Sequence, residues 1–199
     1  MPDEQPRSDE LLIAQIAGGD REAFAELYRR YRLDICRFAA HMSGSPAAAE
    51  DILHEVFVAV IECASRYSPE RTRPKLWLLG IARNHARRFR SLRPTLALPD
   101  DAASAAELTV EPDPVGDLER QRHLAALRRA LLGLPVHYRE AVVLCDLQEL
   151  SYLEAAAALG CAVGTVRSRL HRGRALLARR LCDRGARGPF RMPLTRTIL

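Results

Sequence analysis

Lysine, paired cysteines and long apolar runs are scarce in this sequence of 199 residues. Lys75 is the only lysine among 30 basic residues, so arginine carries nearly all of the positive charge. The cysteines form no C-x-x-C pair, and their scatter favours free thiols in a reducing compartment over disulfides or zinc. They are Cys36, Cys63, Cys145, Cys161 and Cys182. No apolar run is long enough for a membrane span. The start, MPDEQPRSDE, lacks a signal-peptide pattern, and we therefore expect a cytoplasmic protein.

Motifs of the common enzyme classes are also missing. The sequence contains no phosphate-binding glycine loop, no H-E-x-x-H and no G-x-S-x-G. Asp51 and His54 have the spacing of half a di-iron helix motif, but the paired Glu-x-x-His is absent. We expect no catalytic residue, no metal and no cofactor.

Charge is distributed unevenly along the chain, although the net charge is only +5. From Arg167 to the C-terminus there are ten arginines and one acid, and residues 83–93 hold five arginines and no acid. Residues 94–118 hold six acids and no base, namely Asp100, Asp101, Glu107, Glu111, Asp113 and Asp117. Two basic segments around an acidic one favour an anionic polymer as the partner.

Start and stop signals predict an all-α fold. Ser8, Asp20 and Ser45 are typical N-caps, and Pro46 suits the first position of a helix. Apolar residues at helical spacing follow each cap. We expect helices through residue 16, from 20 to a break at 43–46, over 46–67, from 74, over 119–132 and over 136–147. In the third of these helices the residues expected to face inward are Ile52, Leu53, Val56, Phe57, Val60 and Ile61.

Composition divides the chain into two domains. Residues 94–118 are rich in proline, alanine and acids without a helical period, which predicts a flexible linker. Residues 183–199 combine arginine, glycine and proline and predict a disordered basic tail. The expected architecture is two small helical domains, over 8–93 and 119–182, joined by a flexible acidic linker.

The stretch SYLEAAAALGCAVGTVRSRLHRGRALL, residues 151–177, predicts a helix, a tight turn and a second helix. Ser151 and Glu154 form a capping box, and Gly160 suits the end of the first helix. Val166, Leu170 and Leu177 should face the core, leaving a row of donors outside. This is the pattern of a helix-turn-helix in the DNA major groove, although a solvated basic helix in an ordinary bundle is the alternative.

Residues 134–181 closely resemble region 4 of the extracytoplasmic-function (ECF) sigma factors of bacterial RNA polymerase. The resemblance rests on R-E-A-V-V-L, L-S-Y-x-E-A and, most specifically, G-T-V-R-S-R-L-x-R-x-R. It implies recognition of the promoter's minus-35 element by residues of the second helix. These are Thr165, Arg167, Ser168, His171, Arg172 and Arg174.

The segment A-E-D-I-L-H-E-V-F resembles region 2 of the same family, whose acidic helix face docks on the clamp helices of the polymerase β′ subunit. By position, the resemblance assigns this contact to Glu50, Asp51, His54 and Glu55. His54 replaces the usual glutamine. Without the resemblance, an ordinary solvated acidic face would be the preferred interpretation.

The pattern W-L-x-x-I-A-R-N-x-A, beginning at Trp77, resembles the end of region 2 that captures bases flipped out of the opened minus-10 element. Asn84 is the best polar candidate for base recognition. Arg83, Arg87 and Arg88 are candidates for phosphate contacts, which position the DNA without specifying its sequence. Trp77 is at least as consistent with a core position as with base stacking.

The resemblance implies a non-enzymatic sigma factor that binds core RNA polymerase through its β′ and β subunits and directs promoter recognition and melting. Many relatives are held inactive by an anti-sigma factor, which would be a further partner. The main alternative is a helix-turn-helix regulator that acts without being a polymerase subunit. That alternative leaves the acidic helix face and the W-L-x-x-I-A-R-N helix unexplained.

Overall fold

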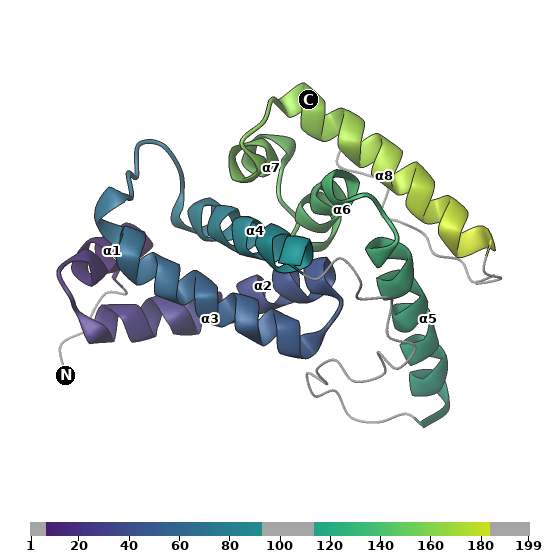
Figure 1. Ribbon diagram of the computed structural model, residues 1–199, viewed down its shortest axis with the longest axis horizontal. Helices are drawn as coiled ribbons and strands as arrows, with labels where there is room; N and C mark the ends of the chain where they lie inside the picture. The colour runs from purple at the N-terminus through teal and green to yellow at the C-terminus, as the bar shows by residue number, and fades with distance from the viewer. Residues whose placement is uncertain (1–6, 93–113, 184–199) are drawn as a thin grey trace.

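The computed structural model describes residues 7–92 and 114–183, with side chains over 7–92 and 121–182. The predicted linker, as far as residue 113, and the predicted tail from residue 184 lie outside the described residues. Within them the chain is helical and contains no strand (Figure 1). The first domain consists of α1 (Asp9–Ala17), α2 (Arg21–Ser43), α3 (Pro46–Cys63), a short 3-10 turn η1 (Ala64–Arg66) and α4 (Pro74–Leu92).

The helices of the first domain begin where the sequence predicts. The side chains of Ser8, Asp20 and Ser45 each accept a hydrogen bond from a backbone N–H in the first turn of the following helix. These bonds satisfy donors that have no partner within the helix, so each cap determines a helix start locally. The third helix ends earlier than predicted, at Cys63, and the chain continues through η1.

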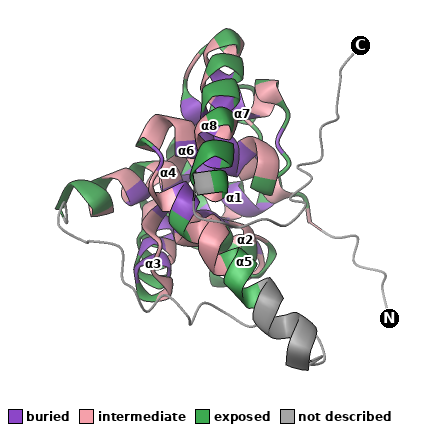
Figure 2. Cartoon of the chain, turned by 90° about the vertical axis from the view of Figure 1, so that its right-hand side faces the viewer, coloured by how far each residue is buried: buried purple, intermediate pink, exposed green. Residues whose placement is uncertain are grey.

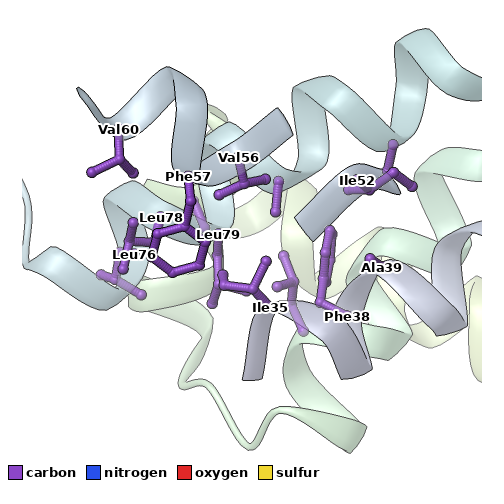
Figure 3. Close-up of a cluster of buried hydrophobic side chains, with 14 of the residues drawn as sticks. Ile35, Phe38, Ala39, Ile52, Val56, Phe57, Val60, Leu76, Leu78 and Leu79 are labelled. Carbon is purple, nitrogen blue, oxygen red and sulfur yellow. The ribbon is translucent and has the colours of Figure 1, made fainter. Parts of the chain in front are cut away.

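The core of the first domain lies between α2, α3 and α4 (Figure 3). Ile35 and Phe38 of α2 face Val56 and Phe57 of α3, and Leu79 of α4 lies beside them. All five side chains are buried because the apolar stripes of the three helices face one another.

Ile61 contradicts the sequence-based prediction that it faces inward, because its residue is 55% exposed. Successive residues of a helix point about 100° apart, and its neighbour Val60 occupies the buried direction at 0% exposure. Leu53 is only partly buried.

The second domain consists of α5 (Pro114–Leu132), α6 (Val136–Val142), a π-helical turn η2 (Val143–Leu147), α7 (Tyr152–Leu159) and α8 (Val163–Asp183). Helix α5 begins five residues earlier than the predicted start at Glu119, so residues 114–118 are helical. Proline suits the first position of a helix because that position needs no N–H donor. Leu131, Val142, Leu170 and Leu177 form the core between α5, α6 and α8.

The two domains pack against each other, which the sequence does not predict. Leu144 and Leu150 of the second domain belong to the same buried cluster as the core of the first, together with residues of α7. Helix α7 packs on α4, and α5 and η2 contact α2. The long helix α8 runs along the outer side (Figure 1). The position of α4 against the second domain determines which arginines remain exposed.

Candidate nucleic-acid interface

The first helix of the predicted helix-turn-helix, α7, is held at both ends by local interactions. Ser151 Oγ accepts from the Glu154 backbone N–H at 3.3 Å, and Glu154 Oε2 accepts from the Ser151 N–H at 2.9 Å. These bonds form the predicted capping box, and hydrogen bonds from Ser151 lower the pKa of Glu154. Gly160 ends the helix with a φ of 61°, a left-handed conformation that glycine adopts without steric cost.

The second helix, α8, buries the predicted apolar face and exposes most of the predicted donors. Val166, Leu170 and Leu177 are at most 1% exposed. Exposed and buried residues alternate along the helix (Figure 2). Four predicted DNA contacts are exposed, and Thr165 is half-buried at the start of the helix. The four are Arg167, Ser168, His171 and Arg172.

Arg174 departs from the prediction that it belongs to this exposed row. Its Nε and Nη2 donate to Oδ2 and Oδ1 of Asp146 in η2 at 3.1 and 2.5 Å. The pairing raises the pKa of Arg174. The Nε–Nη2 edge of the guanidinium group therefore ties α8 to η2, and Arg174 acts within the protein in this conformation.

The four predicted minus-10 contacts on α4 differ in their exposure to solvent. Asn84 and Arg88 are exposed to solvent. Arg83 and Arg87 are partly buried and bind Glu140 of α6, whose side chain is 0% exposed. Arg87 donates through Nε and Nη2 to the two carboxylate oxygens at 2.5 and 2.7 Å, and Arg83 Nε donates at 3.2 Å. Two of the four predicted minus-10 contacts are thus occupied by the second domain.

Trp77 lies at the N-terminal end of the same helix, packed against Tyr67 with a ring-centroid distance of 5.0 Å. Its side chain is partly buried against the core of the first domain. Of the two roles considered from the sequence, the core position is the one this structure displays.

The outer face of α3 carries the predicted acidic cluster. Glu50, Asp51, His54 and Glu55 are all exposed. The same face continues into Val58 and Ile61, which are 39% and 55% exposed. The helical period of the sequence does not predict this apolar part, because it places Ile61 in the core. We call the six residues together the α3 face.

The cysteines are unpaired, and possible metal ligands do not cluster in the part of the chain that is described. All five cysteines are free thiols, and burial raises the pKa of Cys145 to about 12. Among residues 7–92 and 114–183, no group of three or more histidine, cysteine or acidic side chains is arranged to hold a metal ion. None of the described helices combines the length and apolarity needed to cross a bilayer.

Family models match both domains in the predicted order. The sigma-70 region 2 model matches residues 27–93, and the sigma-70 region 4 model matches residues 124–177. The first match begins within α2 and extends past α4, and the second begins within α5 and ends within α8.

Curated relatives match over most of the chain. It is 35% identical over 177 residues to the ECF RNA polymerase sigma factor SigE of Mycolicibacterium smegmatis, covering 87% of this chain and 67% of that protein. It is 36% identical over 180 residues to SigM of Mycobacterium tuberculosis, covering 88% and 85%. It is 32% identical over 182 residues to SigW of Bacillus subtilis, covering 86% and 95%.

Two solved structures share the fold. CnrH in complex with the cytosolic domain of CnrY aligns with a TM-score of 0.67 and 27% identity, covering 90% of this chain and 99% of that one. The sigma factor RpoE of Bartonella quintana, solved with the anti-sigma factor NepR, aligns with a TM-score of 0.61 and 26% identity, covering 81% and 98%.

Proposed function

This chain belongs to the ECF sigma factors of the sigma-70 family, and from that membership we propose how its surfaces divide the work of transcription initiation. As a sigma factor it directs RNA polymerase to promoters. The observation that carries the proposal is that three elements occur together in family order. They are a helix with an exposed acidic face, a basic helix that carries Asn84 and several arginines, and a helix-turn-helix. We assign region 2 to residues 8–93 and region 4 to residues 119–182.

The α3 face is the docking site for core polymerase in this proposal. Glu50, Asp51 and Glu55 supply negative charge for a basic partner surface on the β′ clamp helices. Val58 and Ile61 add apolar area beside them, and an apolar patch rimmed by charged residues is typical of a protein interface. Added salt should therefore weaken the contribution of the acidic residues to association more than the contribution of the apolar residues.

Helix α4 provides the minus-10 contacts. Asn84 can both donate and accept, which base recognition on a flipped nucleotide requires. Arg88 is exposed and suited to a phosphate, and Arg83 and Arg87 join it once they leave Glu140. Phosphate contacts orient the strand, and Asn84 contributes the sequence preference.

Helix α8 provides the minus-35 contacts in the major groove. Arg167 and Arg172 are the candidates for bidentate bonds to guanine, and Ser168 and His171 can bond to bases or phosphates. Thr165 lies at the start of the helix, where the N-terminal residues of a recognition helix meet the DNA. Arg174 supports the helix through Asp146 instead of contacting DNA.

The remaining expectations belong to the same proposal. The protein acts as a non-catalytic subunit without a cofactor, in the cytoplasm where its polymerase is found. An anti-sigma factor is an expected partner, because the similar RpoE structure was solved with the anti-sigma factor NepR and the similar CnrH structure with the cytosolic domain of CnrY. A regulator that never joins polymerase is the rival hypothesis, and it leaves the region 2 match without a role.

The test is run-off transcription with purified core polymerase on genomic fragments, followed by mapping of the start sites. We expect discrete promoters that core enzyme alone does not use. Co-elution with core polymerase is measured in parallel, with the double variant Asp51→Lys and Glu55→Lys. Glu70→Lys, an exposed acid in the loop after η1, is the matched control.

The double variant should lose co-elution while keeping its helical circular dichroism, and the control should keep both. Absence of promoter-specific transcripts, together with absence of co-elution by the wild-type protein, would reject the polymerase-subunit function. Retained co-elution by the double variant would leave the function intact and reject the α3 face as the docking site.

A further inference from the structure

Glu140 is a carboxylate of the second domain whose ion-pair partners in the described structure are both arginines of the first. Its side chain is 0% exposed, and it receives three hydrogen bonds, two from Arg87 and one from Arg83. The two bonds from Arg87 are parallel and bidentate, the geometry in which guanidinium groups also bind phosphate. Glu140 therefore takes up the N–H donors of Arg83 and Arg87 that a DNA phosphate would otherwise use.

Neighbouring contacts hold this carboxylate in place across the domain boundary. Arg139, the preceding residue, donates to the carbonyl of Met42 at the end of α2 at 2.9 Å. Gln148 Nε2 donates to the carbonyl of Asp34 in the middle of α2 at 3.2 Å. Both donors lie in or just after the α6–η2 segment. The second domain is thus fastened to α2 and α4 by a row of polar contacts around a shared apolar cluster.

The closed arrangement also has a desolvation cost, which lowers the free energy needed to separate the domains. A buried carboxylate and the buried guanidinium of Arg139 both lose hydration, and burial lowers the pKa of Arg139 to about 9. Within the described residues, the Nε of Arg139 is buried without an acceptor. When the domains separate, the carboxylate of Glu140 regains water, Arg139 loses its acceptor on Met42, and Arg83 and Arg87 become free to bind phosphate.

We propose that Glu140 is an autoinhibitory latch, which holds Arg83 and Arg87 away from DNA until the two domains are pulled apart. The proposal rests on the function proposed above for these arginines. Binding to core polymerase, which spaces the two domains along a promoter, supplies the free energy for opening. The free protein then binds DNA weakly, and the contacts appear only in the complex that can use them.

The latch is tested by measuring the domain separation and the DNA affinity of the free, full-length protein. Site-specific fluorophores at the exposed positions Glu62 in α3 and Ala178 in α8 report the separation by energy transfer. The DNA probe is a short, labelled single strand of random sequence, because phosphate contacts do not depend on sequence. Glu140→Gln removes the charge and keeps the shape, and Glu149→Gln, an exposed acid of the same domain, is the control.

Glu140→Gln should lower the energy transfer and raise the affinity for the single strand roughly tenfold, because two charge-assisted contacts become available to phosphate. Glu149→Gln should match the wild type in both measurements. An E140Q protein that remains as closed as the wild type would overturn the latch.

A second variant opens the interface without changing any charge. A Cβ at Gly80 of α4 would already contact the carbonyl oxygen of Ala158 in α7 at 3.8 Å, so the three further carbon atoms of the leucine in Gly80→Leu should force the two helices apart. Separation in G80L with tighter binding of the strand supports the proposal. If the domains of G80L separate but its affinity for the strand is unchanged, the proposal is overturned, because Arg83 and Arg87 would have left Glu140 without binding the strand.

The failure of the latch and the failure of the proposed function give different results. Arg87→Ala is tested in the holoenzyme, where the domains are already apart. If it leaves promoter binding by the holoenzyme unchanged, the phosphate role is wrong. If that role holds but the free wild-type protein is already open, the latch alone is wrong.

Discussion

Arg172 and Arg174 lie two residues apart in one motif, yet the structure gives them different environments. Arg172 is exposed on the outer side of α8, whereas Arg174 binds Asp146 through both arms of its guanidinium group. We predict that Arg174→Ala lowers the stability of the protein and that Arg172→Ala does not. Arg172→Ala should instead weaken binding to the minus-35 duplex by about 1–3 kcal/mol, the usual value of one bidentate base contact.

The size of the Arg174 effect follows from its geometry. Removal of the guanidinium leaves Asp146, whose side chain is 16% exposed, without that partner. Hydrogen bonds to charged groups contribute about 1.5–3 kcal/mol, whereas exposed ion pairs contribute about 0.2–1 kcal/mol. The Arg174 side chain is 35% exposed, so solvent screening places the loss between these ranges, at about 1–2 kcal/mol. For a folding unit of this size, that loss lowers Tm by roughly 2–8 °C.

The measurements are thermal unfolding followed by circular dichroism, and the affinity for the minus-35 duplex defined by start-site mapping. A double-mutant cycle with Asp146→Ala isolates the pair, and we expect a coupling free energy of about 1–2 kcal/mol. The reasoning would be refuted by an R174A protein with wild-type stability that loses DNA affinity as strongly as R172A. That result would mean that Arg174 leaves Asp146 to contact DNA.

Three further predictions concern local packing, capping and base recognition. Gly173→Ala should lower Tm, because the added Cβ would lie 2.8 Å from Val142 Cγ2 and 3.1 Å from the Tyr138 carbonyl oxygen. The resulting overpacking costs about 1–3 kcal/mol, which outweighs the gain in helix propensity of at most about 1 kcal/mol. Gly164→Ala is the matched control in the same helix, where no described atom lies within 4 Å of the added Cβ, and a lower Tm there would contradict the packing argument. Ser151→Ala should cost about 0.5–2 kcal/mol at neutral pH. Because the pKa of Glu154 is lowered in the folded protein, its contribution is present above the ordinary value of 4.5 and is lost as pH falls through the lowered pKa, so the Tm difference should narrow in acid. Asn84→Ala should impair promoter melting more than polymerase binding, as measured by permanganate footprinting and co-elution, and normal melting with normal sequence preference would exclude Asn84 from base recognition.

The helix starts of the first domain and the helix-turn-helix could be predicted because their determinants are local. A cap such as Ser151 and its partner Glu154 are three residues apart, and a left-handed residue such as Gly160 is selected by its own backbone geometry. Likewise, Val166 and Leu170 repeat with the period of one helix face. The family motifs themselves are contiguous strings, so their match needs no knowledge of the tertiary structure.

Ile61 shows where a periodic pattern is insufficient. Val60 and Ile61 are both apolar, but adjacent residues of a helix point in different directions and only one of them can face the core. The positions of the neighbouring helices decide which one is buried. The exposed isoleucine then changes the character of the α3 face from acidic to mixed acidic and apolar. Only the packing of the first domain reveals this.

The sequence by itself determined that the chain is helical, which family it belongs to, and which polar and charged side chains each helix carries, because these depend on neighbouring residues. Tertiary structure alone decided which of those arginines are free. Arg83 and Arg87 meet Glu140, and Arg174 meets Asp146, across separations of 28 to 57 residues. In sequence an arginine that binds phosphate and one that binds a carboxylate are identical, because both interactions use the same five donors. Their roles differ only through which acceptor the fold brings within reach.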